Sequence, residues 1–309
     1  MLNFRYHVVS LVAVFLSLGI GVLIGAGALN SPTVEFLQNR INTVEANAEA
    51  RRADNDVLQA EAERLEETLG ALEPFTVTDR LVDANVLVVA VRGVEPETMQ
   101  GIVELARQAG ADAPGILWIE EKWTLRSADD RDALAAALDL TDSRRAVLRA
   151  RGLQTLVDRL SQGAALTSDV LATLADAGFV SFEAAGSEVA LAEIGGPGTE
   201  VLLVVGTDAA VDAKHILLPA AQTAVDAGLP LAAAELYIAV EDGPERGSLV
   251  AFVRNDEALA GEVATVDDLD LPSGSAVALL ALADLRRGEV GHYGFGEGAT
   301  ALTPTFWQP

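Results

Sequence analysis

The 309-residue chain opens with an unbroken apolar run, which gives way first to a heptad pattern and then to alternating strand and helix patterns. From Val8 to Leu29 every residue is apolar or small, and none is charged. As a helix this run is about 33 Å long, which matches the hydrocarbon core of a bilayer, about 30 Å thick. The pattern predicts a transmembrane helix over residues 8–29, after a short N-terminus of residues 1–7.

The end of this run also resembles a signal peptidase site, because residues 26–28 read Ala-Gly-Ala. A cleavable signal has a shorter apolar region, roughly 7–15 residues, behind a clearly basic start. Here the start carries only Arg5, so we expect the helix to be retained as an anchor. Arg5 precedes the helix and Glu35 follows it before any basic residue. The positive-inside tendency therefore predicts a cytoplasmic N-terminus and an extracytoplasmic chain from residue 30 onward.

Small residues recur at every fourth position of the apolar run, at Ala13, Ser17, Gly21 and Gly25. The last two form a G-x-x-x-G pair, a pattern that lets two helix backbones approach closely within lipid. Glycine and alanine are also common in membrane helices that do not pair. The spacing nominates these four residues as a helix-pairing face.

Residues 33–73 follow an unbroken heptad register, which predicts a coiled coil. The a positions are Val34, Ile41, Ala48, Asn55, Ala62 and Leu69, and the d positions are Leu37, Val44, Arg51, Leu58, Leu65 and Leu72. Asn55 at an a position can fix the register at a cost in stability, and Arg51 weakens the middle of the seam further. Pro74 is expected to end the helix.

Three arrangements of this helix stay open. It can pair with a second copy of the chain, pair with the helix of a different protein, or lie as a single amphipathic helix on its own globular domain. We favour a coiled coil, because a parallel coil that begins directly after a small-residue membrane face forms one continuous pairing device.

From residue 75 the pattern changes to short β-branched runs that alternate with alanine-rich helices. Strands are expected at Asn85–Val91, Gly115–Glu120, Glu200–Gly206, Leu229–Leu236 and Ser248–Arg254, with a short one near Val180. Two β-α-β units of similar spacing predict an α/β domain over residues 75–290, with a mainly parallel sheet and flanking helices. The tail, residues 291–309, is expected to be irregular.

Composition excludes several classes of function. The formal net charge is -25, so the surface repels nucleic acid, and no basic stripe offsets this repulsion. Cysteine is absent, which removes disulfides, thiolate metal sites and cysteine nucleophiles together. We expect no nucleic-acid partner.

Ligands of a doubly wound sheet bind beyond the carboxyl ends of its strands. The residues to inspect there are Arg92, Gly93, Gly206, Thr207 and Asp208. Neither loop carries a phosphate-binding glycine motif, and the G-F-G-E-G run of residues 294–298 is expected to be a flexible tail.

The titratable residues form no recognisable catalytic or metal-binding motif. His7, His215 and His292 have no partner at zinc-ligand spacing. Asp267, Asp268 and Asp270 could hold a hard cation but are expected to form a solvated acidic turn. Adjacent Glu120 and Glu121 would point to opposite faces of an extended chain. We therefore predict that the chain is not an enzyme and has no cofactor.

The run N-F-R-Y-H-V-V-S-L, residues 3–11, and the order anchor, coiled coil, α/β domain resemble the actinobacterial MctB family. The family is named for mycobacterial copper transport protein B, and some members are called SteB. The resemblance implies a single-pass envelope protein in copper efflux or copper homeostasis, described for mycobacteria as an outer-membrane channel component. Under the SteB name it implies a scaffold that pairs with the membrane protein SteA to regulate septal peptidoglycan hydrolysis.

The residues do not favour direct copper coordination. Cu(I) prefers thiolate and thioether ligands, whereas the chain has no cysteine and only Met1 and Met99. One helix per chain cannot enclose a pore by itself. Copper binding and an outer-membrane location are therefore implied by the resemblance alone, and we expect action through oligomerisation or partner binding.

Overall fold

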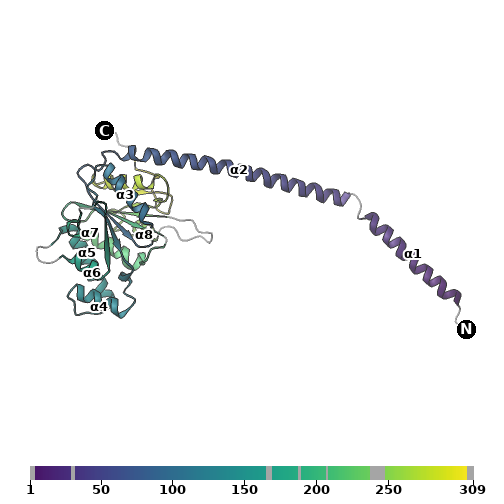
Figure 1. The fold of residues 1–309 in the computed structure, drawn as a ribbon, viewed down its shortest axis with the longest axis horizontal. Helices are drawn as coiled ribbons and strands as arrows, with labels where there is room; N and C mark the ends of the chain where they lie inside the picture. Colours follow the sequence, from purple (N-terminus) through teal and green to yellow (C-terminus); the bar gives the residue numbers. More distant parts are fainter. Residues whose placement is uncertain are drawn as a thin grey trace. The chain divides into compact units, whose positions relative to one another are not determined.

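The computed structural model describes residues 4–28, 32–164, 169–186, 189–206, 208–236 and 248–304. Figure 1 shows two helices followed by an α/β body built around a central sheet. The chain divides into two units, residues 1–65 and 66–309, and each is described by itself below.

Helix α1 (Phe4–Ala28) covers residues 8–28 of the predicted transmembrane segment and begins four residues before it, while Leu29 lies outside the described residues. Within Phe4–Gly27 an 18-residue stretch reaches a mean hydropathy of 2.6, and within the described residues this is the one helix long and apolar enough to cross a membrane. Its large apolar side chains are exposed, with Phe15 at 65% and Leu23 at 75%. Helix α1 is therefore a candidate membrane span.

Helix α2 (Pro32–Val77) is a single unbroken helix of 46 residues, about 69 Å long at about 1.5 Å per residue. The expectation that Pro74 ends it is wrong, because the helix continues to Val77. A proline removes only its own N–H, so the residues that follow it can still donate helical hydrogen bonds. The Thr78 hydroxyl donates to the Pro74 carbonyl oxygen at 2.8 Å and closes the last turn.

The last turns of α2 belong to the α/β unit. Val77 is fully buried in its core. The Glu73 carboxylate accepts a hydrogen bond of 2.9 Å from the backbone N–H of Ala276, in the first turn of helix α9 (Gly274–Leu285). The N-cap residue of α9 makes no side-chain hydrogen bond to the first turn. Glu73 therefore provides an acceptor for one of the backbone N–H groups that have no partner within α9.

The described residues form one seven-stranded sheet in the order β3-β2-β1-β4-β5-β6-β7. The strands are β1 (Asn85–Val91), β2 (Gly115–Ile119), β3 (Val180–Ala184), β4 (Thr199–Val205), β5 (Leu231–Glu235), β6 (Ala264–Val266) and β7 (His292–Tyr293). All neighbouring pairs are parallel except β2 and β3. The predicted α/β class with a mainly parallel sheet is confirmed.

Helices cover both faces of the sheet (Figure 1). One face packs against α3 (Pro96–Gln108) and α9, and the other against α4 (Ala128–Ala137), α5 (Arg145–Gln162), α6 (Val170–Asp176), α7 (Leu218–Asp226) and α8 (Ser248–Asn255). Short 3-10 turns at Glu121–Thr124 and Leu191–Glu193 and a π-helical turn at Ala213–Leu217 complete the connections. Strand β1, which lies between β2 and β4, is apolar throughout after Asn85, as expected for a strand with both faces buried.

Two expectations for the end of the chain are wrong. Residues 248–254 form helix α8 instead of a strand, and Leu249, Val250 and Val253 form its buried face. The tail is not irregular from residue 291, because β7 pairs with β6. Strands of two or three residues are too short to show the alternation that reveals longer ones.

Candidate functional site

The crevice between the carboxyl ends of β1 and β4, where ligands of such sheets bind, is closed by main chain. The Ala210 N–H donates to the Arg92 carbonyl oxygen at 2.7 Å. Gly93 has φ of 111°, and a Cβ there would lie 2.0 Å from the Asp208 carbonyl oxygen. The loops after the two strands therefore fill the predicted position, which Gly206 also borders, while Thr207 lies outside the described residues.

A polar cluster lies beside this closed crevice, at the carboxyl ends of β1 and β2. Arg92 pairs with Glu120 at 3.0 Å and donates to the Ser181 hydroxyl at 2.8 Å. Ser181 in turn donates to Glu120 at 2.6 Å, and the Arg92 guanidinium stacks 4.3 Å from the Trp118 ring centroid. Glu121 points elsewhere and pairs with Arg126 at 2.6 Å, so the two adjacent glutamates do not act together.

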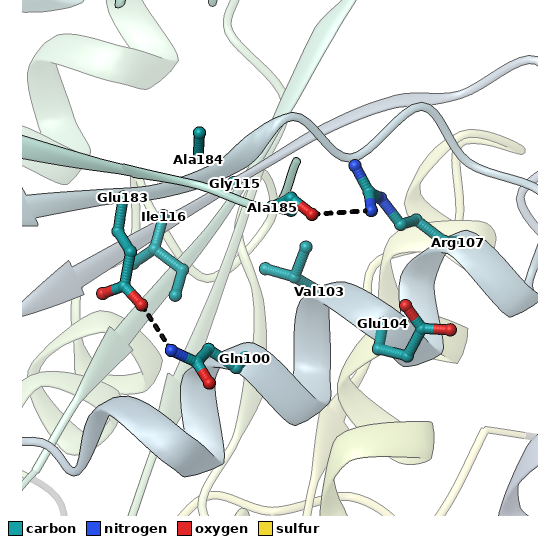
Figure 2. A pocket seen from close by; sticks show the side chains of 9 residues that line it. All are labelled: Gln100, Val103, Glu104, Arg107, Gly115, Ile116, Glu183, Ala184 and Ala185. Carbon is teal, nitrogen blue, oxygen red and sulfur yellow. Dashed lines mark hydrogen bonds between the residues drawn. The ribbon is translucent and has the colours of Figure 1, made fainter. Parts of the chain in front are cut away.

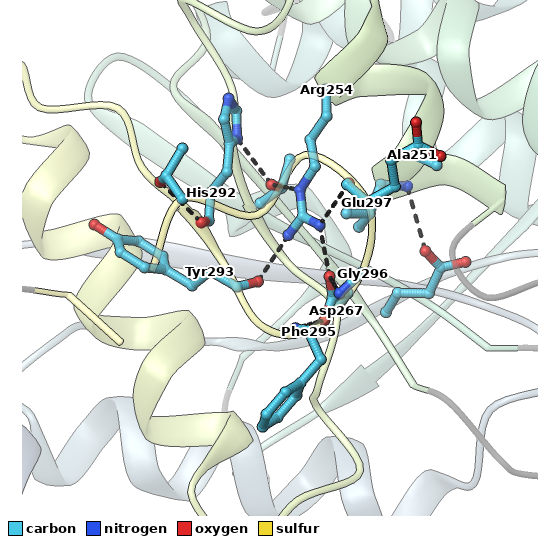
Figure 3. A network of polar contacts seen from close by, with 12 residues as sticks. Ala251, Arg254, Asp267, His292, Tyr293, Phe295, Gly296 and Glu297 are labelled. Carbon is cyan, nitrogen blue, oxygen red and sulfur yellow. Dashed lines mark hydrogen bonds and ion pairs between the residues drawn. The ribbon is translucent and has the colours of Figure 1, made fainter. Parts of the chain in front are cut away.

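A second network, at the carboxyl ends of β6 and β7, is centred on the ion pair of Arg254 and Asp267 (Figure 3). The two atoms Nη1 and Oδ2 lie 2.5 Å apart, and the side chains are 2% and 3% exposed. Arg254 also donates to the Thr265 hydroxyl at 2.8 Å and to the carbonyl oxygens of Tyr293 at 2.7 Å and Glu297 at 3.2 Å. This guanidinium is almost fully satisfied, as burial of an ion requires.

The G-F-G-E-G run wraps the other side of the Asp267 carboxylate. Backbone N–H groups of Phe295 and Gly296 donate to its two oxygens at 2.7 and 2.8 Å. Gly294 has φ of 122°, and a Cβ there would lie 2.0 Å from Asp267 Oδ1. The expectation of a flexible glycine tail is therefore wrong: the glycine lets backbone donors approach a buried carboxylate.

His292 extends the network away from Arg254. Its Nε2 lies 3.1 Å from the Ala260 carbonyl oxygen, and its Nδ1 lies 2.9 Å from the Thr265 hydroxyl. Because a carbonyl can only accept, the geometry assigns the proton to Nε2. Burial first, and then the charge of Arg254, lower the pKa of His292. The neutral ring therefore connects Thr265, which Arg254 also contacts, to Ala260 in the loop before β6.

The expectation of a solvated acidic turn is wrong for Asp267 and Asp268, which are only 4% and 6% exposed, whereas Asp270 is exposed. Asp268 Oδ1 is buried without a hydrogen-bond partner among the described residues. Burial, followed by the charge of Asp267, raises the pKa of Asp268 to about 6. Burial likewise raises the pKa of Glu200 to about 7, although Arg286 lies 3.1 Å away.

We expect Asp268→Asn to stabilise the protein at neutral pH. The native pKa of Asp268 lies above its unfolded value, so the stability it contributes is fully present below about pH 4 and is lost as pH rises through about 6. The amide should raise the free energy of unfolding by about 1–3 kcal/mol at pH 7.5 and change it little at pH 4. Denaturant unfolding monitored by fluorescence of buried Trp118 and Trp123 tests this, with exposed Asp226→Asn as the control. Equal effects at both pH values would contradict the assignment.

No group of three His, Asp or Glu side chains with metal-binding geometry occurs within the described residues. His7 lies on α1, and His215 is a surface residue whose Nδ1 is 2.7 Å from Asp212. The polar contacts described at the carboxyl edge thus link its elements together.

A pocket of about 280 Å³ opens between α3 and the edge strand β3 (Figure 2). The Arg107 guanidinium donates to the Ala113 carbonyl oxygen at 3.0 Å and to that of Ala185 at 3.1 Å. Glu183 accepts hydrogen bonds from Gln100 and, at 3.2 Å, from the indole N–H of Trp118. Sequence patterns did not reveal this pocket, because its walls lie about 80 residues apart in the chain.

The residues that the heptad register assigns to a coiled-coil seam are on the surface of α2. The apolar members of the seam are 44–66% exposed: Val34, Leu37, Ile41, Val44, Leu58, Leu65, Leu69 and Leu72. Asn55 is exposed as well. A stripe of this length that stays in water is costly, so it marks a surface suited to another helix.

The small residues of α1 are likewise uncovered. Apart from the adjacent residues and the nearby backbone of α1 itself, no described atom lies within 4 Å of a Cβ built at Gly21 or Gly25. Ser17 donates its hydroxyl to the Val14 carbonyl oxygen at 2.9 Å, and Ala13 lies one turn before Ser17. Pairing through this face stays a prediction.

Comparison with known proteins gives one consistent result over the whole chain. The family model described as "Copper transport outer membrane protein, MctB" matches residues 1–304. Copper transporter MctB of Mycobacterium tuberculosis is 27% identical over 331 residues, which cover 98% of this chain and 99% of the relative. The protein of the same name in Mycobacterium leprae is 26% identical over 320 residues, with the same coverage of both chains.

Proposed function

Because the chain belongs to the MctB family, we propose that it serves copper efflux or copper homeostasis at the cell envelope as a non-enzymatic, helix-paired component. In this proposal α1 anchors the chain in the membrane, with residues 1–7 in the cytoplasm. Helix α2 and the α/β domain lie outside, where they assemble with a second copy or with a partner protein.

The exposed apolar stripe of α2 is the observation that carries this proposal. Eight large apolar side chains keep 44–66% of their surface exposed along one seam. Pairing would bury them, and burial of each such side chain is worth about 1.5–3 kcal/mol. The seam therefore supports a function that depends on assembly.

Direct copper coordination has weaker support. The chain lacks cysteine, and Met99 is fully buried inside the domain. Soft Cu(I) needs thiolate or thioether ligands, so a strong site on this chain would lack its preferred atoms. We infer that copper is the cargo of the assembly and is not held by this chain alone.

The test measures cell copper and copper binding together. In a mycobacterial strain that lacks its own family member, the chain should lower cell-associated copper, and Leu58→Asp should abolish that effect. The isosteric Met99→Leu variant should act like the unchanged chain. The full-length protein in nanodiscs should bind Cu(I) more weakly than micromolar when titrated against a chromophoric chelator. Stoichiometric Cu(I) binding at nanomolar concentration, or full activity of Leu58→Asp, would overturn the proposal.

A second candidate function rests on the same seam. A scaffold that pairs with SteA to regulate septal peptidoglycan hydrolysis would also need a long exposed helix. Recovery of SteA with the full-length chain from detergent-solubilised membranes, lost in Leu58→Asp, would favour this function. If the chain also leaves cell-associated copper unchanged in the mycobacterial strain described above, the result favours the scaffold function over copper efflux.

A further inference from the structure

Strand β3 is an edge of the sheet. Among the described residues it pairs on one side only, with β2, in antiparallel register. The bonds Glu120 N–H to Phe179 and Ala185 N–H to Pro114 fix which residues face β2. Alternate residues in an antiparallel strand direct their amide groups to opposite sides. The N–H and C=O groups of Phe182 and Ala184 therefore point away from the sheet.

The pocket of Figure 2 lies directly beside this edge. Gln100, Glu104 and Arg107 line it from one side of α3, and Glu183 and Ala184 line it from β3. Arg107 holds the end of β3 in place through the Ala185 carbonyl oxygen, at 3.1 Å. That carbonyl has no ladder donor opposite it, because Pro114 lacks an N–H. The side chain of Arg107 thus fixes the position of β3 at the border of the pocket.

The charges that border the pocket are mainly negative. Among the described residues Glu183 accepts hydrogen bonds from two neutral donors, Gln100 and Trp118, and Glu104 contacts Gln108 at 3.4 Å. Neither carboxylate forms an ion pair within the part of the chain that the structure describes. Arg107 directs its Nε and one Nη group to main-chain carbonyl oxygens. A cationic group is the natural complement of this pocket.

We propose that β3 and the adjoining pocket form a docking groove for an extended segment of a partner protein, which adds a strand at the edge and places a lysine or arginine between Glu104 and Glu183. Main-chain hydrogen bonds from Phe182 and Ala184 give the segment its affinity, and the pocket selects the basic side chain. This surface is separate from the α2 seam. The chain can therefore engage a partner at two places.

Fluorescent peptides test the groove on the full-length protein in nanodiscs. The probe is Thr-Val-Thr-Lys-Thr-Val-Thr with blocked ends, whose alternation puts lysine and the valines on one face. The matched probe carries glutamate in place of lysine. We expect saturable binding of the lysine peptide at micromolar concentration, and binding at least about 10-fold weaker for the glutamate peptide, since two partly exposed ion pairs are lost.

Two variants connect this binding to the groove. Glu104→Gln should weaken binding of the lysine peptide about 2- to 5-fold, whereas exposed Glu257→Gln should not. Ala184→Pro removes an outward N–H and should abolish binding. If Ala184→Pro does not fold, hydrogen exchange of the unchanged protein with and without the lysine peptide tests the groove instead. The bound peptide should slow exchange of the Phe182 and Ala184 amide hydrogens. Equal affinity for both peptides, an unchanged Glu104→Gln variant, or no protection at β3 would overturn the proposal.

Discussion

Replacing Arg254 by alanine is expected to lower the free energy of unfolding by about 3–5 kcal/mol, because the change leaves the Asp267 carboxylate buried without its cation. Asp267 is 3% exposed and keeps only its backbone donors. A domain of this kind is stable by about 5–15 kcal/mol in total, so the loss is a large share. The variant should populate the unfolded state under mild denaturant.

The same substitution at a surface pair provides the control. Arg144 pairs with Asp142 at 2.6 Å, almost the same separation, but the Arg144 side chain is 77% exposed. Solvent screens that pair, so Arg144→Ala should change stability little. Urea unfolding of the full chain, followed by Trp118 and Trp123 fluorescence, measures both variants. Similar losses for the two would show that burial does not set the strength of the Arg254 pair.

Replacing Leu58 by aspartate should weaken self-pairing of the chain about 100-fold or more. The change removes a d-position leucine from each of two helices and places two carboxylates opposite each other. The lost apolar burial alone is about 1.5–3 kcal/mol per leucine. Asn55→Leu should act in the opposite direction, because it replaces a polar a position by an apolar one.

Absence of cysteine from the chain makes this pairing simple to trap in membranes. Ile41→Cys places a thiol at an a position, within disulfide distance of its counterpart in a parallel pair. Ala46→Cys, at the outward f position, is the matched control. We expect disulfide-linked dimers with Ile41→Cys only, and their yield should fall when Leu58→Asp is added. Equal yields from the two thiols would contradict a specific seam and leave a different protein as the partner of α2.

Local patterns predicted the parts of the fold that form within one segment. The apolar run and the heptad register identified α1 and α2, because a helix shows its period in neighbouring residues. The long strands β1 and β4 were equally visible as buried β-branched runs. The helix at residues 248–254 was not visible, because a short, mainly apolar segment fits a strand as well as a helix. In the structure the Glu235 carboxylate accepts a hydrogen bond of 3.3 Å from the N–H of Val250, in the first turn of α8, which favours the helix.

The carboxyl edge of the sheet could not be derived in this way. Whether Asp267 is solvated or buried depends on Phe295 and Gly296, which follow it by 28 and 29 residues. Arg254 reaches it from a third element. Residue spacing does not indicate contacts between such distant segments, so the sequence predicted a flexible tail for the glycine run.

The sequence by itself determined a candidate membrane helix, a heptad-patterned helix and an acidic, cysteine-free α/β domain, since apolar runs, heptads and composition are properties of neighbouring residues or of simple counts. The tertiary structure alone decided that the crevice at the switch point is closed, that an ion pair is buried at β6 and β7, and that a carboxylate-lined pocket opens beside β3. Each of these results depends on contacts between distant segments, which only packing brings within a few ångströms.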